Sequence, residues 1–241
     1  MAREDTPAGR LHALLVEMRG RSNTQLRGAW APIFRCEPAD TSALVQGVVA
    51  VLALPDETEA AVRRLPNVDH DLLLGWRARV DAAMSIAHQL ETTVENFKAQ
   101  YTEVDTMLLQ VVADQLDRNE PPVHMEADAV AQAADLVGQL LDALEAIDDE
   151  DARGLLVRHA LRLQAALRLF KVSGAEGVRE ALLDSVAALS AVSNGRPEAD
   201  ERKGVRKYWE LIAFVANAFT IAGTAYQLAP GVASVVKAIT Q

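Results

Sequence analysis

The chain has 241 residues with a formal net charge of −10, and half of its residues are hydrophobic although only 5% are aromatic. This apolar content excludes a disordered chain, and the negative charge argues against a general nucleic-acid binder, which needs a basic surface. The single cysteine, Cys36, excludes an intrachain disulfide and a cysteine-rich zinc site.

The N-terminal part, residues 1–66, is predicted to form short helices. Every long apolar pattern in the chain has helical spacing, and no convincing alternating strand occurs. The first helix is expected to begin after Thr6, which is followed by a proline. Ser22 and Gln25 have the spacing of a capping box and predict the start of a second helix. Pro55 is expected to begin another short helix.

The central stretch, residues 69–118, contains no proline and one glycine. Its apolar residues repeat in alternating steps of three and four, which predicts one long helix with a coiled-coil-like seam. A second seam covers residues 123–144, directly after a Pro-Pro turn. Two seams joined by a short turn predict an antiparallel helical hairpin. The first seam consists of Trp76, Val80, Ala83, Ala87, Leu90, Val94, Phe97, Tyr101, Val104, Leu108 and Val111.

Two further helical patterns follow, and Asn194-Gly195 is a strong signal for the end of the second one. The predicted fold class is therefore all-α: an elongated helical bundle with a long central antiparallel helical hairpin and an apolar C-terminal helix. The predicted parts are N-terminal short helices at 1–66, the central hairpin and bundle at 67–195, a charged linker at 196–204 and an apolar C-terminal segment at 205–241.

The C-terminal segment is the most unusual part of the sequence. Residues 211–236 are 26 consecutive positions without Asp, Glu, Lys, Arg or His. The nineteen residues before Pro230 would span about 28 Å as a helix, close to a bilayer core of about 30 Å. Basic residues followed by aromatic residues precede the run, as at a cytoplasmic membrane boundary. These are Arg202, Lys203, Arg206, Lys207, Tyr208 and Trp209.

Two interpretations of this segment remain open, because a polar but uncharged face runs along it. The segment is either a membrane-associated helix or a nearly buried helix of a soluble core. In the membrane or oligomer interpretation, the expected contact residues are Tyr208, Trp209, Phe214, Asn217, Thr220, Thr224 and Gln227. The basic residues Arg202, Lys203, Arg206 and Lys207 are then expected to contact an anionic surface.

The charge is divided unevenly along the chain. Residues 202–241 contain five basic groups and one acidic group, a net charge of +4, which leaves −14 on residues 1–201. A basic flank beside an apolar helix suits an anionic membrane surface.

No pattern in the sequence indicates a metal site or a cofactor, and we expect neither. The acidic run of residues 148–151 is interpreted as a helix start, where carboxylates favour the positive end of the helix dipole. The five histidines include no His-Glu-x-x-His pattern, and no glycine-rich phosphate loop occurs.

Two short motifs resemble those of known families. Arg153 and His159 lie six residues apart on a predicted helix, which resembles the Arg-x(4–6)-His motif of HEPN helical-bundle ribonucleases, although Gly154 stands where that family usually has a polar residue. The resemblance implies RNA cleavage at a dimer interface, with the histidine as a general base. Tyr101 and Asp105 match the Tyr-x(3)-Asp signal of type VII secretion substrates, but Tyr101 is expected to be a core position of the seam.

The leading hypothesis is a non-enzymatic bacterial helical protein that binds other protein chains or itself. Its C-terminal segment is expected to serve membrane attachment or oligomerisation, as in a membrane-acting effector of toxin or defence biology. The alternatives are the HEPN-like ribonuclease using Arg153 and His159, and a soluble homodimer formed through the central seam. We expect no signal peptide and no nucleic-acid partner, and a cytoplasmic location, with attachment to the inner face of the membrane as an extension. The bacterial origin rests on arginine usage, since lysine occurs at only five positions.

Overall fold

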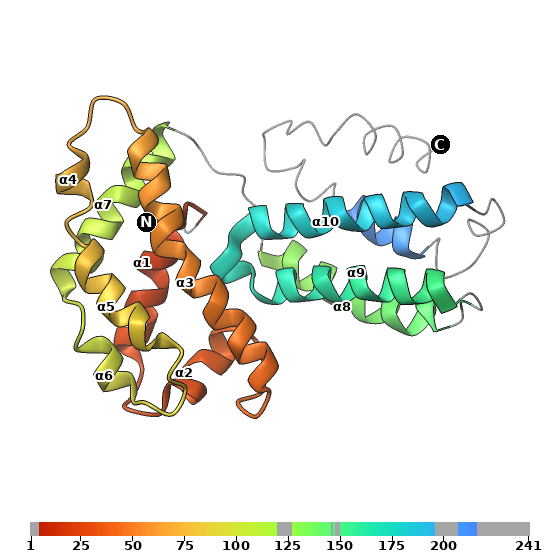
Figure 1. The fold of residues 1–241 in the computed structure, drawn as a ribbon, viewed down its shortest axis with the longest axis horizontal. Coiled ribbons are helices and arrows are strands. Elements are labelled where there is room, and N and C mark those ends of the chain that lie inside the picture. The colour runs from red at the N-terminus through yellow and green to blue at the C-terminus, as the bar shows by residue number, and fades with distance from the viewer. Residues whose placement is uncertain (1–4, 120–126, 146, 148–149, 196–206, 216–241) are drawn as a thin grey trace. The chain divides into compact units, whose positions relative to one another are not determined.

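A computed structural model describes residues 5–119, 127–145, 147, 150–195 and 207–215 (Figure 1). Within these residues the regular secondary structure is helical, with one isolated antiparallel bridge between Gln25 and Thr93. The all-α prediction is confirmed. The chain divides into two compact units, one of residues 1–122 with 171–174 and the other of residues 123–170 with 175–241.

The first unit is built on α1, which packs against both α3 and α7 (Figure 1). Thr6 caps α1 as predicted, because its Oγ1 accepts a hydrogen bond from the Gly9 N–H at 3.0 Å. The helices of this unit are α1 (Pro7–Gly20), α2 (Leu26–Ile33), α3 (Thr41–Arg64), α4 (His70–Leu73), α5 (Arg77–Ala87), α6 (Val94–Lys98) and α7 (Glu103–Asn119).

Two predicted helix starts in this unit are wrong. The residue before α2 is Gln25, whose side chain makes no capping hydrogen bond, so Ser22 does not begin the helix. Pro55 lies inside α3, where it is buried. The helix continues through this proline because the apolar positions on both sides of it share one buried face.

The predicted continuous helix over residues 69–118 is also wrong, because the chain breaks there into α4, α5, α6 and α7. Each of the last two breaks carries a local capping pair. Thr93 Oγ1 accepts from the Asn96 N–H at 3.3 Å at the start of α6. At the start of α7, the Asp105 carboxylate accepts from the Thr102 N–H and the Thr102 hydroxyl, both at 2.7 Å. Such pairs satisfy the free donors of a helix start, so they stabilise a new helix in place of a continued one.

The break before α7 shifts the phase of the seam. Predicted positions up to Phe97 and Tyr101 are buried, apart from a half-buried Leu90, but Val104 and Val111 are 61% and 48% exposed. The buried face of α7 is instead Asp105, Thr106, Leu109, Val112, Ala113 and Leu116. Asp105 is only 2% exposed, and its carboxylate lies 3.4 Å from Arg79 Nη1. The side chain that caps α7 is therefore also part of the buried face of this helix.

A row of aromatic side chains forms the centre of the first unit. The Trp30 ring stacks on Phe34 at a centroid distance of 5.3 Å and meets the edge of Phe97 at 5.6 Å. Tyr101 continues the row, and its hydroxyl donates to the Leu15 carbonyl at 2.8 Å. Burial raises the pKa of this hydroxyl. Tyr101 is thus a core residue, as the seam predicted.

Residues 171–174 belong to the first unit because Arg10 holds them. Arg10 is 7% exposed, and its Nε donates to the Val172 carbonyl while Nη1 donates to the Asp5 carbonyl, both at 2.7 Å. Gly174 has a φ of +66°, and a Cβ there would lie 2.5 Å from Arg10 Nη1. Only glycine meets both demands, the left-handed backbone and the close approach.

The second unit contains α8 (Ala127–Leu144), α9 (Glu150–Arg168), α10 (Phe170–Gly195, kinked at Gly174) apart from residues 171–174, and a helical segment at 207–215. α8 packs against α9. The predicted hairpin of the two central seams is not confirmed, because its first arm is broken into α4 to α7, and α7 and α8 are assigned to different units. The first seam is buried within the first unit only as far as Tyr101, and the second seam contributes Val130, Val137 and Leu144 to the core of the second unit. The predicted end of a helix at Gly195 lies at the edge of the described residues, because residues 196–206 are outside them.

Asp105→Ala should destabilise the chain by about 2 kcal/mol, because it removes the cap of α7 and leaves the Thr102 N–H without its acceptor. Urea unfolding followed by circular dichroism measures this loss. Glu103→Ala changes an exposed carboxylate in the same helical turn and should cost a few tenths of a kcal/mol. Equal losses in the two variants would contradict the role given to Asp105.

Candidate functional site

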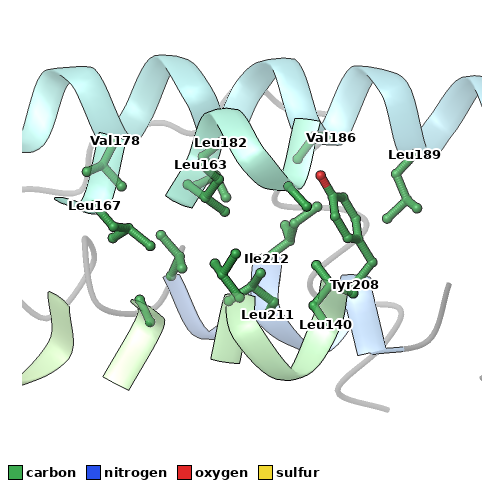
Figure 2. Packing of buried hydrophobic residues seen from close by; sticks show 14 of the residues in the cluster. Leu140, Leu163, Leu167, Val178, Leu182, Val186, Leu189, Tyr208, Leu211 and Ile212 are labelled. Atoms are coloured by element: carbon green, nitrogen blue, oxygen red, sulfur yellow. The ribbon is translucent and has the colours of Figure 1, made fainter. Parts of the chain in front are cut away.

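The beginning of the uncharged C-terminal run lies in the core of the second unit. Side chains at a helical spacing of three and four point into the cluster formed by α8, α9 and α10 (Figure 2). They are Tyr208, Leu211, Ile212 and Val215, each no more than 2% exposed. For residues 207–215 this arrangement is that of a core helix, the second of the two interpretations made from sequence.

Tyr208, predicted as a membrane or oligomer contact, is fully buried in this cluster. Burial raises the pKa of its hydroxyl to about 12. Trp209 and Phe214 are partly buried and pack against the same cluster, while Lys207 is half-buried. The other predicted contacts, Arg202, Lys203, Arg206, Asn217, Thr220, Thr224 and Gln227, lie outside the described residues.

No helix among the residues that the structure describes has the length and apolar character needed to cross a bilayer. The nineteen-residue stretch considered from sequence extends beyond residue 215, where the described part ends. This finding therefore concerns the helices of the two units and not that stretch.

The two residues of the ribonuclease-like motif lie on α9 but make separate contacts. Arg153 Nη1 donates to the Ile147 carbonyl at 3.1 Å, and Nη2 lies 3.6 Å from a Glu150 carboxylate oxygen. His159 is six residues further on, a rise of about 9 Å and a rotation of about 240°, so the two side chains leave different faces of the helix. Within one copy the structure does not bring Arg153 and His159 together.

His159 has an environment that favours its neutral form. Its Nδ1 is buried and has no hydrogen-bond partner among the described residues. Burial lowers the pKa of the imidazole, the positive charges of Arg162 and Arg158 lower it further, and Asp184 acts in the opposite direction. A neutral imidazole is the form that accepts a proton in general-base catalysis.

The described residues contain no group of three or more His, Cys, Asp or Glu side chains placed to hold a metal ion. Glu150 and Asp151 occupy the first turn of α9, as expected for acidic residues at a helix start. Asp148 and Asp149 lie outside the described part of the chain.

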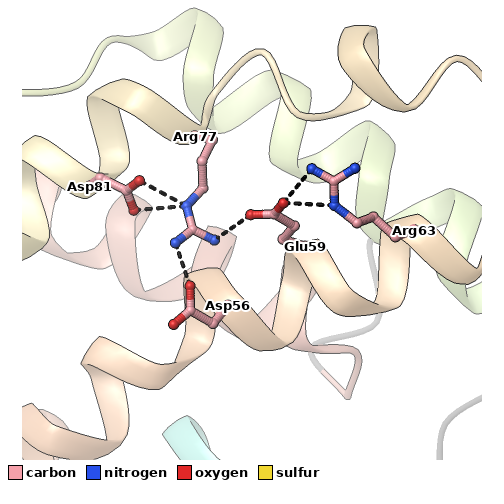
Figure 3. A network of polar contacts seen from close by, with 5 residues as sticks. All are labelled: Asp56, Glu59, Arg63, Arg77 and Asp81. Atoms are coloured by element: carbon pink, nitrogen blue, oxygen red, sulfur yellow. Dashed lines mark hydrogen bonds and ion pairs between the residues drawn. The ribbon is translucent and has the colours of Figure 1, made fainter.

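A cluster of paired charges in the described part of the first unit links α3 to α5 (Figure 3). Arg77 donates to Asp81 at 2.8 and 2.9 Å and to Glu59 at 3.1 Å, and it also pairs with Asp56. Burial alone would lower the pKa of Arg77, but the hydrogen bonds and charges of Asp81 and Asp56 raise it. Arg63 pairs with Glu59 on the outer side. Each charged group of the cluster is paired with another, so the cluster links the two helices.

Two exposed apolar rows were not predicted as surfaces. Val104, Met107 and Val111 of α7 are 61%, 55% and 48% exposed. A second row, Val45, Val49 and Leu52 of α3, is 50%, 62% and 36% exposed. The capping pair at Thr102 could have revealed the first row from sequence, and the long uncharged stretch at the start of α3 could have revealed the second.

No family model matches this chain, and no curated protein or solved structure is significantly similar to it.

The native state should lose stability as the pH falls below about 6.5, because the pKa of His159 is lower in the folded chain than in the unfolded chain. The unfolded chain then binds the extra proton. In His159→Gln the fall in the urea midpoint between about pH 7.5 and about pH 5.5 should be smaller than in the wild type. Arg162→Gln, which removes a positive charge that lowers this pKa, should also reduce the fall. An equal fall in all three proteins would contradict the assignment.

Proposed function

We propose that the chain is a non-enzymatic helical protein that binds other protein chains, and that its C-terminal segment attaches it to a membrane or joins copies of it. The observation that carries the proposal is the 26-residue run without charged side chains at 211–236, directly after a basic cluster. A run of this length has few roles in a chain with a net charge of −10 other than burial in a core, in a bilayer or in an oligomer.

The structure supports this proposal by anchoring the start of the run. Tyr208, Leu211, Ile212 and Val215 are held in the core of the second unit, which connects the remaining uncharged residues to a folded body. The basic residues before the anchor add attraction to an anionic surface, at about 1 kcal/mol for each Lys or Arg near it.

The exposed row on α7 supports a role in binding protein. Val104, Met107 and Val111 occupy one face over two turns of the helix. Glu103 and Asp114 stand along one edge of this face, which suits a partner helix with an apolar face and a basic edge.

Deleting the tail tests the proposal, and the position of the cut matters. A cut after Gly204 would remove four buried core side chains, whereas the variant 1–215 keeps them. Full-length protein should sediment with vesicles containing anionic lipid, or form oligomers that 1–215 does not form, while 1–215 remains folded by circular dichroism and does not sediment with the vesicles. Replacing Arg202, Lys203, Arg206 and Lys207 by Gln in the full chain should weaken binding to anionic vesicles but not to neutral ones. Full-length protein that behaves as 1–215 does in both assays would overturn the proposal.

The alternative function is the HEPN-like ribonuclease, and the lowered pKa of His159 is the observation that supports it. This alternative requires a second copy to bring Arg153 to His159. It predicts RNA cleavage by the full chain and its loss in His159→Ala, with His88→Ala as the control at an exposed histidine. Absence of cleavage by the wild-type protein would reject it.

A further inference from the structure

The first half of α3 is a helix without charge. The fifteen residues from Thr41 to Pro55 include no Asp, Glu, Lys, Arg or His. A helix that is apolar on all sides is normally buried on all sides. In this chain only one side is buried: Leu44, Val48 and Val51 are at most 3% exposed and face the core of the first unit.

The opposite side of α3 faces solvent. Val45, Val49 and Leu52 are 50%, 62% and 36% exposed, and they follow one another at steps of four and three residues. Ser42, Gln46 and Ala53 are exposed on the same side and are also uncharged. We name these six residues the α3 outer face.

The charges at the two ends of the α3 outer face differ. Asp56 follows the face at its C-terminal end, where it pairs with Arg77 in a cluster that contains more carboxylates than guanidinium groups (Figure 3). At the N-terminal end, Arg27 Nη1 donates to the Thr41 hydroxyl at 3.2 Å and to the Pro38 carbonyl at 2.8 Å, and Arg27 Nε pairs with Glu91 at 3.0 Å. The Asp40 carboxylate is used there to cap the helix, accepting from the Ala43 N–H at 2.9 Å.

We propose that the α3 outer face binds the same face of a second copy of this chain, with the two α3 helices antiparallel and a two-fold axis at Val49. The spacing supports this arrangement, because one apolar residue lies about a helical turn before Val49 and another about a turn after it, so the face is complementary to itself. In such a pair Val45 of one copy lies opposite Leu52 of the other, and the two Val49 side chains meet.

Charge favours the antiparallel direction of the pair and the uncharged face as the place of contact. Two chains that each carry −10 repel one another, and an uncharged face is where they approach at the least cost. The antiparallel direction places Asp56 beside the N-terminal end of the other α3, which is the positive end of its helix dipole, and it opposes the two helix dipoles. A parallel pair would instead set the two Asp56 ends side by side, with like charges in contact.

The α3 outer face belongs to the first unit, so a dimer formed through it goes beyond the function proposed for the C-terminal segment. It also replaces the dimer predicted through the central seam, whose residues from Trp76 to Ala87 are buried within one copy. Three apolar side chains from each copy form a small interface, so we expect a reversible dimer with a dissociation constant on the order of micromolar.

The first experiment measures the mass of the full chain by light scattering over a range of concentrations. The wild type should change reversibly from monomer to dimer, and Val49→Glu should raise the dissociation constant by about tenfold or more while keeping the helical circular dichroism spectrum. Val16→Glu is the matched control, since Val16 is a 46% exposed valine on α1 of the same unit, and it should behave as the wild type does. A monomeric wild type, or equal behaviour of the two variants, overturns the proposal.

The second experiment reports the direction of the pair without weakening it. Under mild oxidation, Val49→Cys should form a dimer through a disulfide between the two introduced thiols, identified by peptide mass spectrometry. The parent chain, in which Cys36 is the single cysteine, is the control. Val45→Cys alone should cross-link weakly, but a mixture of Val45→Cys and Leu52→Cys chains should cross-link to each other.

Cross-linking of Val45→Cys to itself as efficient as that of Val49→Cys, or no disulfide at position 49, overturns the antiparallel pair. Both experiments can be repeated on 1–215, in which the dimer should persist even if the tail has no membrane or oligomer role. The failure of one proposal is thereby distinguished from the failure of the other.

Discussion

The buried carboxylate of Asp105 is the constraint that determines the surface of the first unit. It accepts the Thr102 N–H and hydroxyl, and through this capping it fixes where α7 begins. A buried carboxylate needs such partners, so the phase of the helix cannot slip without leaving a charge unsatisfied. With the phase set, Leu109, Val112 and Leu116 face the core, and the row beginning at Val104 faces solvent. The exposed apolar row is thus a direct consequence of the polar cap.

The second unit shows why an apolar segment is ambiguous when only its sequence is known. A protein core and a bilayer both require side chains without charge, so Leu211 and Ile212 satisfy either environment equally well. The two environments differ in the side chains that surround the segment. In this chain the surrounding side chains include Leu140 on α8, Leu163 and Leu167 on α9, and Leu182 on α10. These partners lie far away in sequence. The core assignment applies to residues 207–215, and the proposed function concerns the uncharged residues after Val215.

Helix caps and apolar seams could be predicted from the sequence, whereas the helix against which each apolar face packs could not. The Thr6 cap and the seam from Trp76 to Ala87 depend on residues within a few turns, and both are found. The prediction of one long helix is wrong because the capping pairs Thr93–Asn96 and Thr102–Asp105 start new helices inside a regular apolar repeat. The repeat also does not specify the partner of α8: it shows that α8 has an apolar face, but α9 offers an equally suitable one. Ridges and grooves of similar size do not specify which helix is the neighbour.

The α3 helix also has an apolar face whose packing neighbour the sequence does not specify. Its inner residues repeat as a core helix should, and its outer residues repeat just as well, so periodicity alone does not say which side is buried. The first unit buries one side, through Leu44, Val48 and Val51, and the other remains apolar in a chain with a large negative charge. Elsewhere on the first unit, acidic side chains such as Asp56, Glu57 and Glu59 are matched by Arg77 and Arg10. An acidic protein that pairs its charges around an uncharged helical face reduces the repulsion that would otherwise keep two copies apart. The same pairing leaves little attraction for a highly charged partner, so the surface selects an apolar and nearly neutral occupant, and the face of an identical α3 has that chemistry.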